Sequence, residues 1–370
     1  MNFDYSDEQK ALASEARKLL DDRCGSSALR AVMDSAEPYD RGLWTAIGEL
    51  GWLGALVPEA HGGLGLSRVD VCALAEELGR ALAPVPFAST VYFLTEALLL
   101  AGSAQQQARL LPLLAEGLPI GAFAAVEQPG ALAATAVAAR VTDGRLSGSK
   151  LPVVDGDCAD VAVVLAWENE ALGLFLVNLH ADGIERTSLE SLDPTRSIAR
   201  IDFNDAPAER LGQPGQGWAL LETLLDRAAV YFAFEQIGGA DRCLDMARDY
   251  ARQRIAFGRP VGANQAIKHK LADVYARNQL ARSNAYYGAW ALAANAPELP
   301  LAAATARVAA SDAYWVASKE NIQTHGGIGF TWELDAQLFY RRAKQLALVA
   351  GAPRLWKQRL AQHLLTRRSA

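Results

Sequence analysis

Apolar residues recur at helical spacing through the first third of the chain. Ser6 and Gln9 have the spacing of a helix-capping box, and apolar positions then follow every three or four residues. A glycine-rich stretch, GWLGALVPEAHGGLGL at residues 51–66, interrupts the pattern before helical spacing returns at residues 69–82. The pattern therefore predicts a helical N-terminal domain over residues 1–118.

The pattern changes in the middle of the chain, where short apolar runs are bounded by turn-forming residues. VAVVLAW, LGLFLVNL and ARIDF are typical of strands, and Asp143 with Gly144 indicates a tight turn between two further strands. We therefore predict a small antiparallel β domain over residues 119–217.

Helical spacing returns from Trp218 to the C-terminus, in segments long enough for a helix of well over twenty residues. Wide apolar, alanine-rich faces on such helices predict a four-helix bundle that also forms an oligomer interface, over residues 218–370. The predicted fold class is α+β, in the order helical, β, helical.

Composition narrows the class of protein. The chain has 370 residues, of which 51% are apolar and 21% charged, so it is not intrinsically disordered. A net charge of −6 without a basic run argues against nucleic acid as a partner. We expect no transmembrane helix, since no apolar run approaches about 18 residues, and no signal peptide, and thus a cytoplasmic protein.

The cysteines and histidines indicate neither a disulfide framework nor a metal site. The four cysteines lie far apart without a CxxC pair, and the five histidines form no HExxH pattern. We expect free thiols and no metal.

Three segments together resemble the acyl-CoA dehydrogenase family. They are the glycine-rich stretch at residues 51–66, the RIAFGRPVGANQ segment at 254–265, and the QTHGGIGFTWE segment at 323–333. Each alone is a weak signal, but their order and spacing match the family across the whole chain. The resemblance implies an acyl-CoA dehydrogenase-like fold with the domain order given above.

The resemblance also implies a reaction. Family members hold FAD between subunits and remove the α proton of an acyl-CoA thioester with a glutamate base. The β hydride passes to the flavin, which an electron-transfer flavoprotein then reoxidises. The implied cofactor is therefore FAD, the substrate an acyl-CoA, and the partner an electron-transfer flavoprotein.

Arg254 resembles the family arginine that reaches the FAD diphosphate of a neighbouring subunit. A guanidinium suits this role because it binds phosphate oxygens in a bidentate manner. By the same resemblance, Phe257 packs on that dinucleotide and Gln265 hydrogen-bonds it. The alternative is a surface arginine and a core phenylalanine at helical spacing.

The resemblance assigns a second FAD-contacting loop to Gln323, Gly326, Gly327 and Gly329, also directed at a neighbour's cofactor. Glycines allow a backbone to approach a ligand closely. The alternative is a plain helix–helix turn. We expect His325 to be a turn or interface residue rather than a catalytic one.

The family's catalytic bases have no counterpart at the matching positions. Ala350 occupies the position of the usual glutamate, and Ala228 that of the glutamate which a second group carries on the long helix. Asp226 lies two residues from that position, or about 200° around the helix. Glu235 shares the face of Ala228, although we favour an ion pair with an arginine from another helix. We assign no catalytic residue.

The β domain departs from the family as well. The family pattern Thr-Glu-Pro-x-x-Gly-Ser is VEQPGAL here, at residues 126–132, and the hydroxyl that bonds the flavin is replaced by Val154. The groups that a subunit gives to its own flavin are therefore largely absent, whereas those given to a neighbour's flavin are kept.

This asymmetry leads to three hypotheses. In the first, the chain is a partner subunit that completes the FAD site of a catalytic subunit, as in the α2β2 acyl-CoA dehydrogenases of actinobacteria that act on ring-bearing thioesters such as steroid side chains. In the second, it is a self-sufficient homotetrameric dehydrogenase with Glu235 or Asp226 as base. In the third, it is a scaffold or binding protein without flavin. The sequence does not define the acyl specificity or the electron acceptor.

Overall fold

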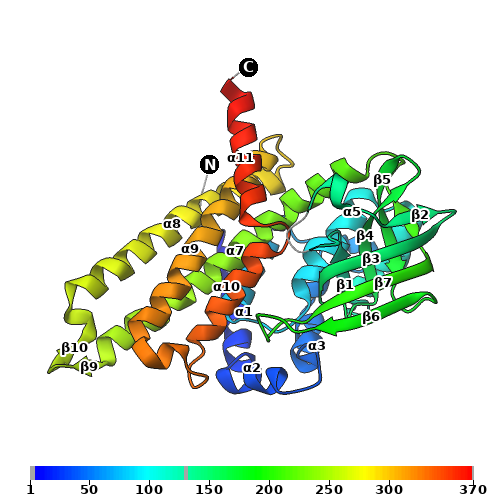
Figure 1. Ribbon diagram of the computed structural model, residues 1–370. Coiled ribbons are helices and arrows are strands. Elements are labelled where there is room, and N and C mark those ends of the chain that lie inside the picture. The colour runs from blue at the N-terminus through cyan, green and yellow to red at the C-terminus, as the bar shows by residue number, and fades with distance from the viewer. Residues whose placement is uncertain (1–4, 129–131, 369–370) are drawn as a thin grey trace. The chain divides into compact units, whose positions relative to one another are not determined.

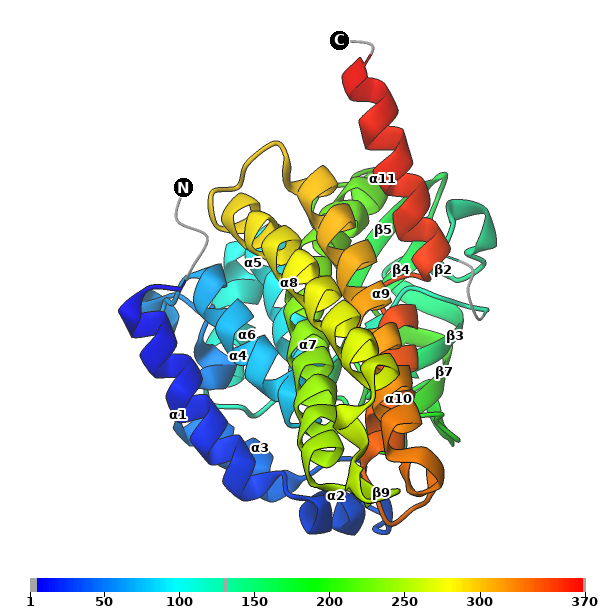
Figure 2. The ribbon, with the colours of Figure 1, turned by 90° about the vertical axis from the view of Figure 1, so that its left-hand side faces the viewer.

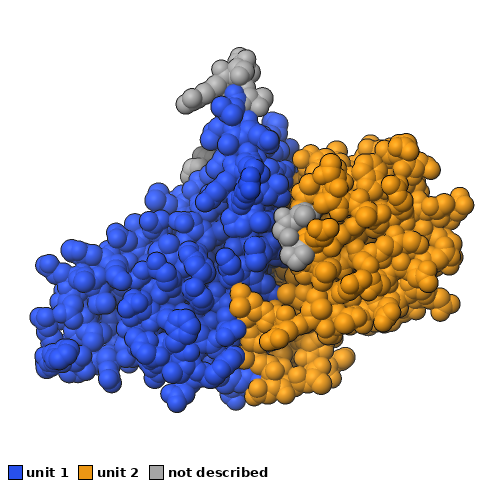
Figure 3. Space-filling model, in the orientation of Figure 1, with its two compact units in different colours: residues 1–30, 68–83, 229–370 blue, residues 31–67, 84–228 orange. Residues whose placement is uncertain are grey.

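The computed structural model describes residues 5–128 and 132–368. The chain forms two compact units, coloured separately in Figure 3. Unit 1 comprises residues 1–30, 68–83 and 229–370, and unit 2 comprises residues 31–67 and 84–228. This division follows compactness rather than sequence order, so the boundaries predicted at residues 118 and 217 stay predictions.

Unit 1 is built from long helices (Figures 1 and 2). Its elements are α1 (Asp7–Arg23), α4 (Arg68–Arg80), the greater part of α7 (Gly217–Gln253), α8 (Gln265–Ala293), α9 (Leu299–His325), the short helix η6 (Gly326–Phe330), α10 (Ala336–Leu348) and α11 (Pro353–Arg368). α9 packs against α8, α10 and α11, and seven of its sixteen buried residues are alanines, which allow neighbouring helices to approach closely. The 37 residues of α7 confirm the long helix that the sequence predicts.

Local sequence features define the ends and contacts of these helices. Ser6 caps α1 in a capping box with Gln9, as predicted. α4 and α7 touch backbone to backbone, since a Cβ on Gly238 would lie 1.8 Å from the carbonyl oxygen of Glu76. Only glycine permits that approach, so Gly238 fixes the position of α4 on α7.

Unit 2 contains a twisted sheet with the strand order β6-β7-β3-β2-β4-β5-β8, with β1 on β4. The strands are β1 (Gly121–Ala124), β2 (Arg140–Thr142), β3 (Arg145–Val154), β4 (Val161–Glu168), β5 (Ala171–Asn178), β6 (Ile184–Leu189), β7 (Ile198–Pro207) and β8 (Glu209–Leu211). Most neighbours are antiparallel, as predicted, but β4 runs parallel to both β1 and β2. The predicted turn at Asp143 and Gly144 joins β2 to β3, with φ of 50° and 75°.

Short helices complete unit 2. They are α3 (Arg41–Glu49), η1 (Trp52–Gly54), η2 (Glu59–His61), the π-helical segment η3 (Ala88–Thr95), α5 (Glu96–Ala101) and α6 (Ala104–Ala115), while α2 (Ser26–Met33) passes from one unit to the other. η3 packs on β1, where the rings of Phe93 and Phe123 stack with centroids 4.2 Å apart. This contact anchors the helices on the sheet.

None of the described helices is long and apolar enough to cross a membrane. The four cysteines are free, and the described residues contain no group of three or more side chains that could hold a metal ion.

Candidate functional site

The two halves of the predicted flavin site lie in different units. Arg254, Phe257, Gln265 and residues 323–329, which the resemblance directs at a neighbour's FAD, all belong to unit 1. The segments that would serve the chain's own FAD belong to unit 2, and of these residues 129–131 lie outside the described part of the chain. Each half can therefore be assessed by itself.

We call the two segments that the resemblance directs at a neighbour's FAD, residues 254–265 and 323–333, the donated segments. The first of them begins with a hairpin at the end of α7. The strands β9 (Ile255–Ala256) and β10 (Arg259–Pro260) pair antiparallel, and the turn between them places Phe257 at φ 53° and Gly258 at φ 78°. These left-handed values suit a two-residue hairpin turn but are strained for phenylalanine. Phe257 is fully exposed, so unit 1 gains no packing from this strained side chain.

Arg254 lies where this hairpin joins α7. Its backbone N–H donates to the carbonyl of Tyr250 at 2.8 Å, whereas its exposed guanidinium makes no ion pair or hydrogen bond with the described residues. Gln265 begins α8 and is also exposed. The side chains of both residues are thus available to a ligand from outside unit 1.

The second donated segment follows α9. Gly326 ends the helix at φ 66°, and Gly329 is packed so tightly that a Cβ would lie 2.6 Å from the carbonyl oxygen of Ile322. Gly327 differs, because its φ is ordinary and a Cβ there would meet nothing within 4 Å. Packing in this chain does not require glycine at position 327, whereas close approach by an outside ligand would.

Large apolar side chains are exposed on both segments. Phe330 is 71% exposed and Trp332 is 56% exposed, in addition to Phe257. Exposed apolar side chains that lie close together often mark an interaction site. Phe330 and Trp332 lie two residues apart and give the second segment such an exposed apolar surface.

The other half-site, in unit 2, has its polar groups committed internally. The Glu127 carboxylate accepts hydrogen bonds from the N–H groups of Ala138 and Ala139, at 2.7 and 2.9 Å, and from Lys150 at 2.7 Å. Burial opposes ionisation of Glu127, but the Lys150 ammonium and these backbone donors lower its pKa overall. Val154 ends β3 with a hydrocarbon side chain. Neither Glu127 nor Val154 supplies a donor for a flavin.

Both positions that hold a base in the family are alanines in buried surroundings. Ala228 is fully buried in α7, and Ala350 follows α10 at φ 58°. The carbonyl of Ala350 accepts the indole N–H of Trp356 at 3.1 Å, which fixes the turn between α10 and α11. A methyl group at either position cannot remove a proton.

Glu235 is a buried counter-ion of arginine, in the arrangement that the sequence analysis favours over a base. Its Oε1 lies 3.6 Å from Nη1 of Arg342, and both side chains are almost fully buried. Arg307 is also fully buried and donates to the side chain of Gln236 and to the carbonyls of Leu346 and Val349. Burial lowers the pKa of Arg307 to about 9, although the negative charge of Glu235 acts to raise it.

Sequence reasoning missed a second buried carboxylate, in unit 2. Glu96 at the start of α5 is fully buried and accepts from Arg227 at 2.8 Å, next to the buried Asp226. No local pattern links two residues 131 positions apart, so the sequence carries no signal for this pair.

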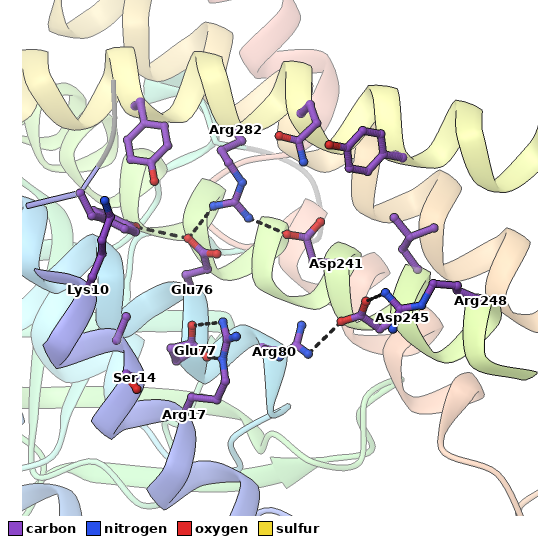
Figure 4. A pocket seen from close by; sticks show the side chains of 16 residues that line it. Lys10, Ser14, Arg17, Glu76, Glu77, Arg80, Asp241, Asp245, Arg248 and Arg282 are labelled. Atoms are coloured by element: carbon purple, nitrogen blue, oxygen red, sulfur yellow. Dashed lines mark hydrogen bonds and ion pairs between the residues drawn. The ribbon is translucent and has the colours of Figure 1, made fainter. Parts of the chain in front are cut away.

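A pocket of about 560 Å³ opens on unit 1 between α1, α4, α7 and α8 (Figure 4). Its acidic residues pair with its arginines: Glu77 with Arg17 at 2.6 Å, Asp245 with Arg80 at 2.8 Å, and Glu76 and Asp241 with Arg282 at 2.9 and 2.5 Å. Burial opposes the charge of Arg282, but the two carboxylates raise its pKa overall. The pocket contains none of the predicted site residues, and its ion pairs join the four helices.

Known sequences resemble the chain over almost its whole length. Residues 6–118 match the family "Acyl-CoA dehydrogenase, N-terminal domain" and residues 215–365 match "Acyl-CoA dehydrogenase, C-terminal domain". The protein called acyl-CoA dehydrogenase IpdE2 of Mycobacterium tuberculosis is 36% identical over 355 residues, covering 96% of both chains.

Solved structures show the same fold. A chain of the ChsE4-ChsE5 complex from Mycobacterium tuberculosis superposes with a TM-score of 0.89 at 26% identity, covering 99% of both chains. A chain from a variant of the Tcur3481-Tcur3483 steroid ACAD superposes with a TM-score of 0.89 at 29% identity, covering 98% of this chain and 99% of that one. The predicted fold class is thus confirmed.

Proposed function

Because the chain belongs to the acyl-CoA dehydrogenase family, we propose that it is a partner subunit that donates half of an FAD site to a catalytic subunit. Members of this family are FAD-dependent oxidoreductases, and FAD supplies the hydride acceptor for α,β-desaturation of an acyl-CoA thioester. In this proposal the chain completes that FAD site and contributes no base of its own.

One observation supports the proposal above all others: the donated half-site in unit 1 is kept, while the half in unit 2 has lost its flavin-directed groups. The guanidinium of Arg254 has no partner among the described residues and suits a diphosphate. Glu127, by contrast, is held by Lys150 and backbone donors, and Val154 has no hydroxyl.

The donated residues fit FAD by their chemistry. Arg254 would hold the diphosphate, Gln265 would hydrogen-bond the dinucleotide, and Phe257 would pack against it. A Cβ at Gly327 would meet nothing within 4 Å, so a ligand could approach the backbone closely there. The exposed aromatic surface of these segments would be covered by the catalytic subunit, which also buries the strained Phe257 side chain.

The catalytic subunit would supply the base that this chain lacks. Ala350 and Ala228 cannot accept a proton, and Glu235 is held by Arg342. A two-component complex among the structural relatives, ChsE4-ChsE5, supports an assembly of two different chains, here α2β2. A steroid ACAD among the relatives supports a ring-bearing acyl-CoA as substrate. We further propose a cytoplasmic enzyme reoxidised by an electron-transfer flavoprotein.

Co-expression tests this proposal. The chain is purified alone and then together with a candidate catalytic acyl-CoA dehydrogenase subunit that carries the glutamate base, and visible absorbance measures bound flavin. We expect flavin only in the co-purified complex, with desaturase activity that a substitution of the partner's base abolishes. A yellow, active protein from this chain alone would overturn the proposal. A colourless complex would favour a scaffold without flavin.

A further inference from the structure

His325 lies within the second donated segment but is turned into the protein. Its ring is buried, and Nδ1 donates to the backbone carbonyl of Asn321 at 2.8 Å. A carbonyl can only accept, so Nδ1 carries the hydrogen. Burial lowers the pKa of His325 although this hydrogen bond opposes the change, which favours the neutral ring. His325 is therefore a fixed, uncharged part of the α9 terminus.

The ring of His325 packs on Tyr250 of α7, with centroids 4.3 Å apart and planes inclined by 37°. Tyr250 lies one helical turn before Arg254, and its carbonyl accepts the Arg254 N–H at 2.8 Å. The contact therefore joins the last turn of α9 to the turn of α7 that carries the hairpin. It links the two donated segments in space, although they are far apart in sequence.

The loop after α9 is folded around His325. Gly329 lies so close that a Cβ placed there would be 3.1 Å from the Cβ of His325. Asn321, one turn earlier, makes a second link to α7 through its amide and the Met246 sulfur, at 3.9 Å. The ends of α7 and α9 are thus joined over two successive turns, with the imidazole nearest the exposed loop.

We propose that His325 is a positioning residue, which holds the Arg254 hairpin and the Gln323–Gly329 loop in the relative geometry that binds a neighbour's FAD. Its ring contacts Tyr250 beside the first segment, and its backbone belongs to the second segment. A bidentate contact to a diphosphate needs accurate placement of the guanidinium. This inference rests on the proposed function above.

Two substitutions separate ring packing from the mere presence of a side chain. His325→Ala removes the contact with Tyr250, whereas His325→Phe keeps an aromatic ring there and loses only the hydrogen bond to Asn321. His180→Phe is the matched control, because His180 is an exposed surface residue of unit 2 paired with Asp160. FAD affinity is measured by titrating the flavin-free complex of this chain with its catalytic subunit, and far-UV circular dichroism and complex mass are recorded in parallel.

We expect His325→Ala to assemble normally but to bind FAD about tenfold more weakly, the magnitude of a lost aromatic contact. His325→Phe should recover most of that affinity, and His180→Phe should match the wild type. The inference is overturned if His325→Ala binds FAD like the wild type, if its weaker binding follows only from failure to assemble, or if the phenylalanine variant is as weak as the alanine variant. A wild-type complex without FAD instead overturns the proposed function, and this inference with it.

Discussion

Arg342 faces Glu235 across the interior of unit 1, with 3.6 Å between Nη1 and Oε1. Glu235 on α7 supplies a negative charge to this arginine of α10, near the buried Arg307 of α9. The relationship identifies Glu235 as a counter-ion that joins α7 to α10.

Replacing Glu235 by glutamine should therefore destabilise the chain rather than stop chemistry. Two buried guanidiniums would lose their carboxylate, and breaking a buried ion pair in this way costs roughly 3 kcal/mol. Thermal unfolding of the isolated chain measures the loss. In the complex with the catalytic subunit, turnover per bound FAD should stay unchanged at a temperature where the variant remains folded. Loss of α-proton exchange with unaltered unfolding would instead identify Glu235 as a base.

Arg254→Ala should weaken FAD binding by the complex without affecting the fold. The guanidinium makes no ion pair with the described residues, so the free energy of unfolding should not change measurably. The lost diphosphate contact should weaken FAD binding by about 2 kcal/mol, or roughly thirtyfold. Arg252→Ala, an exposed arginine two residues earlier on α7, is the control. Equal FAD affinities in the two variants would rule out the assigned role of Arg254.

Phe257→Asn should affect stability and FAD binding in opposite directions. Asparagine tolerates φ 53° better than phenylalanine, so the isolated chain should unfold at the same or a slightly higher temperature, with a gain of up to about 1 kcal/mol. The complex should bind FAD more weakly, because the aromatic contact is lost. Differential scanning calorimetry and FAD titration test the two effects. A less stable isolated chain would show that Phe257 packs within its own subunit.

The lowered pKa of His325 predicts a stability change on the acid side. Its pKa is about 6.5 in the unfolded chain and lower in the folded protein, so the unfolded state binds more protons between these two values. The contribution of His325 to the free energy of unfolding is therefore fully present above about pH 6.5, and it decreases as the pH falls toward the pKa of the folded protein. Denaturant unfolding at pH 7.5 and 5.5 should show a smaller decrease for His325→Phe than for the wild type. Equal decreases would exclude His325 as the source.

Much of the fold follows from local pattern. The capping box at Ser6, the length of α7 and the turn at Asp143 and Gly144 are each encoded by adjacent residues, and the structure confirms all three. The parallel pairing of β4 with β1 and β2 depends on the path of the chain between strands, which apolar alternation does not specify.

The parts of the candidate site that lie within one continuous segment could be predicted from the sequence. The contacts between residues far apart in sequence could not. The exposed Phe257 hairpin and the glycine loop lie within the matching segments. The contact of His325 with Tyr250 and the pair of Glu235 with Arg342 each join residues more than seventy positions apart, and a single sequence carries no record of such proximity. The separation of the two half-sites between units likewise emerges only from tertiary packing.

The central claim is that this chain completes an FAD site that belongs to another subunit. The most direct test is the flavin content, measured by visible absorbance, of the chain purified alone and in complex with its catalytic partner. We predict a colourless isolated chain and a yellow complex with about one FAD per two chains, as expected for a composite site shared between subunits. One FAD per chain in the isolated protein, with desaturase activity, would contradict the claim.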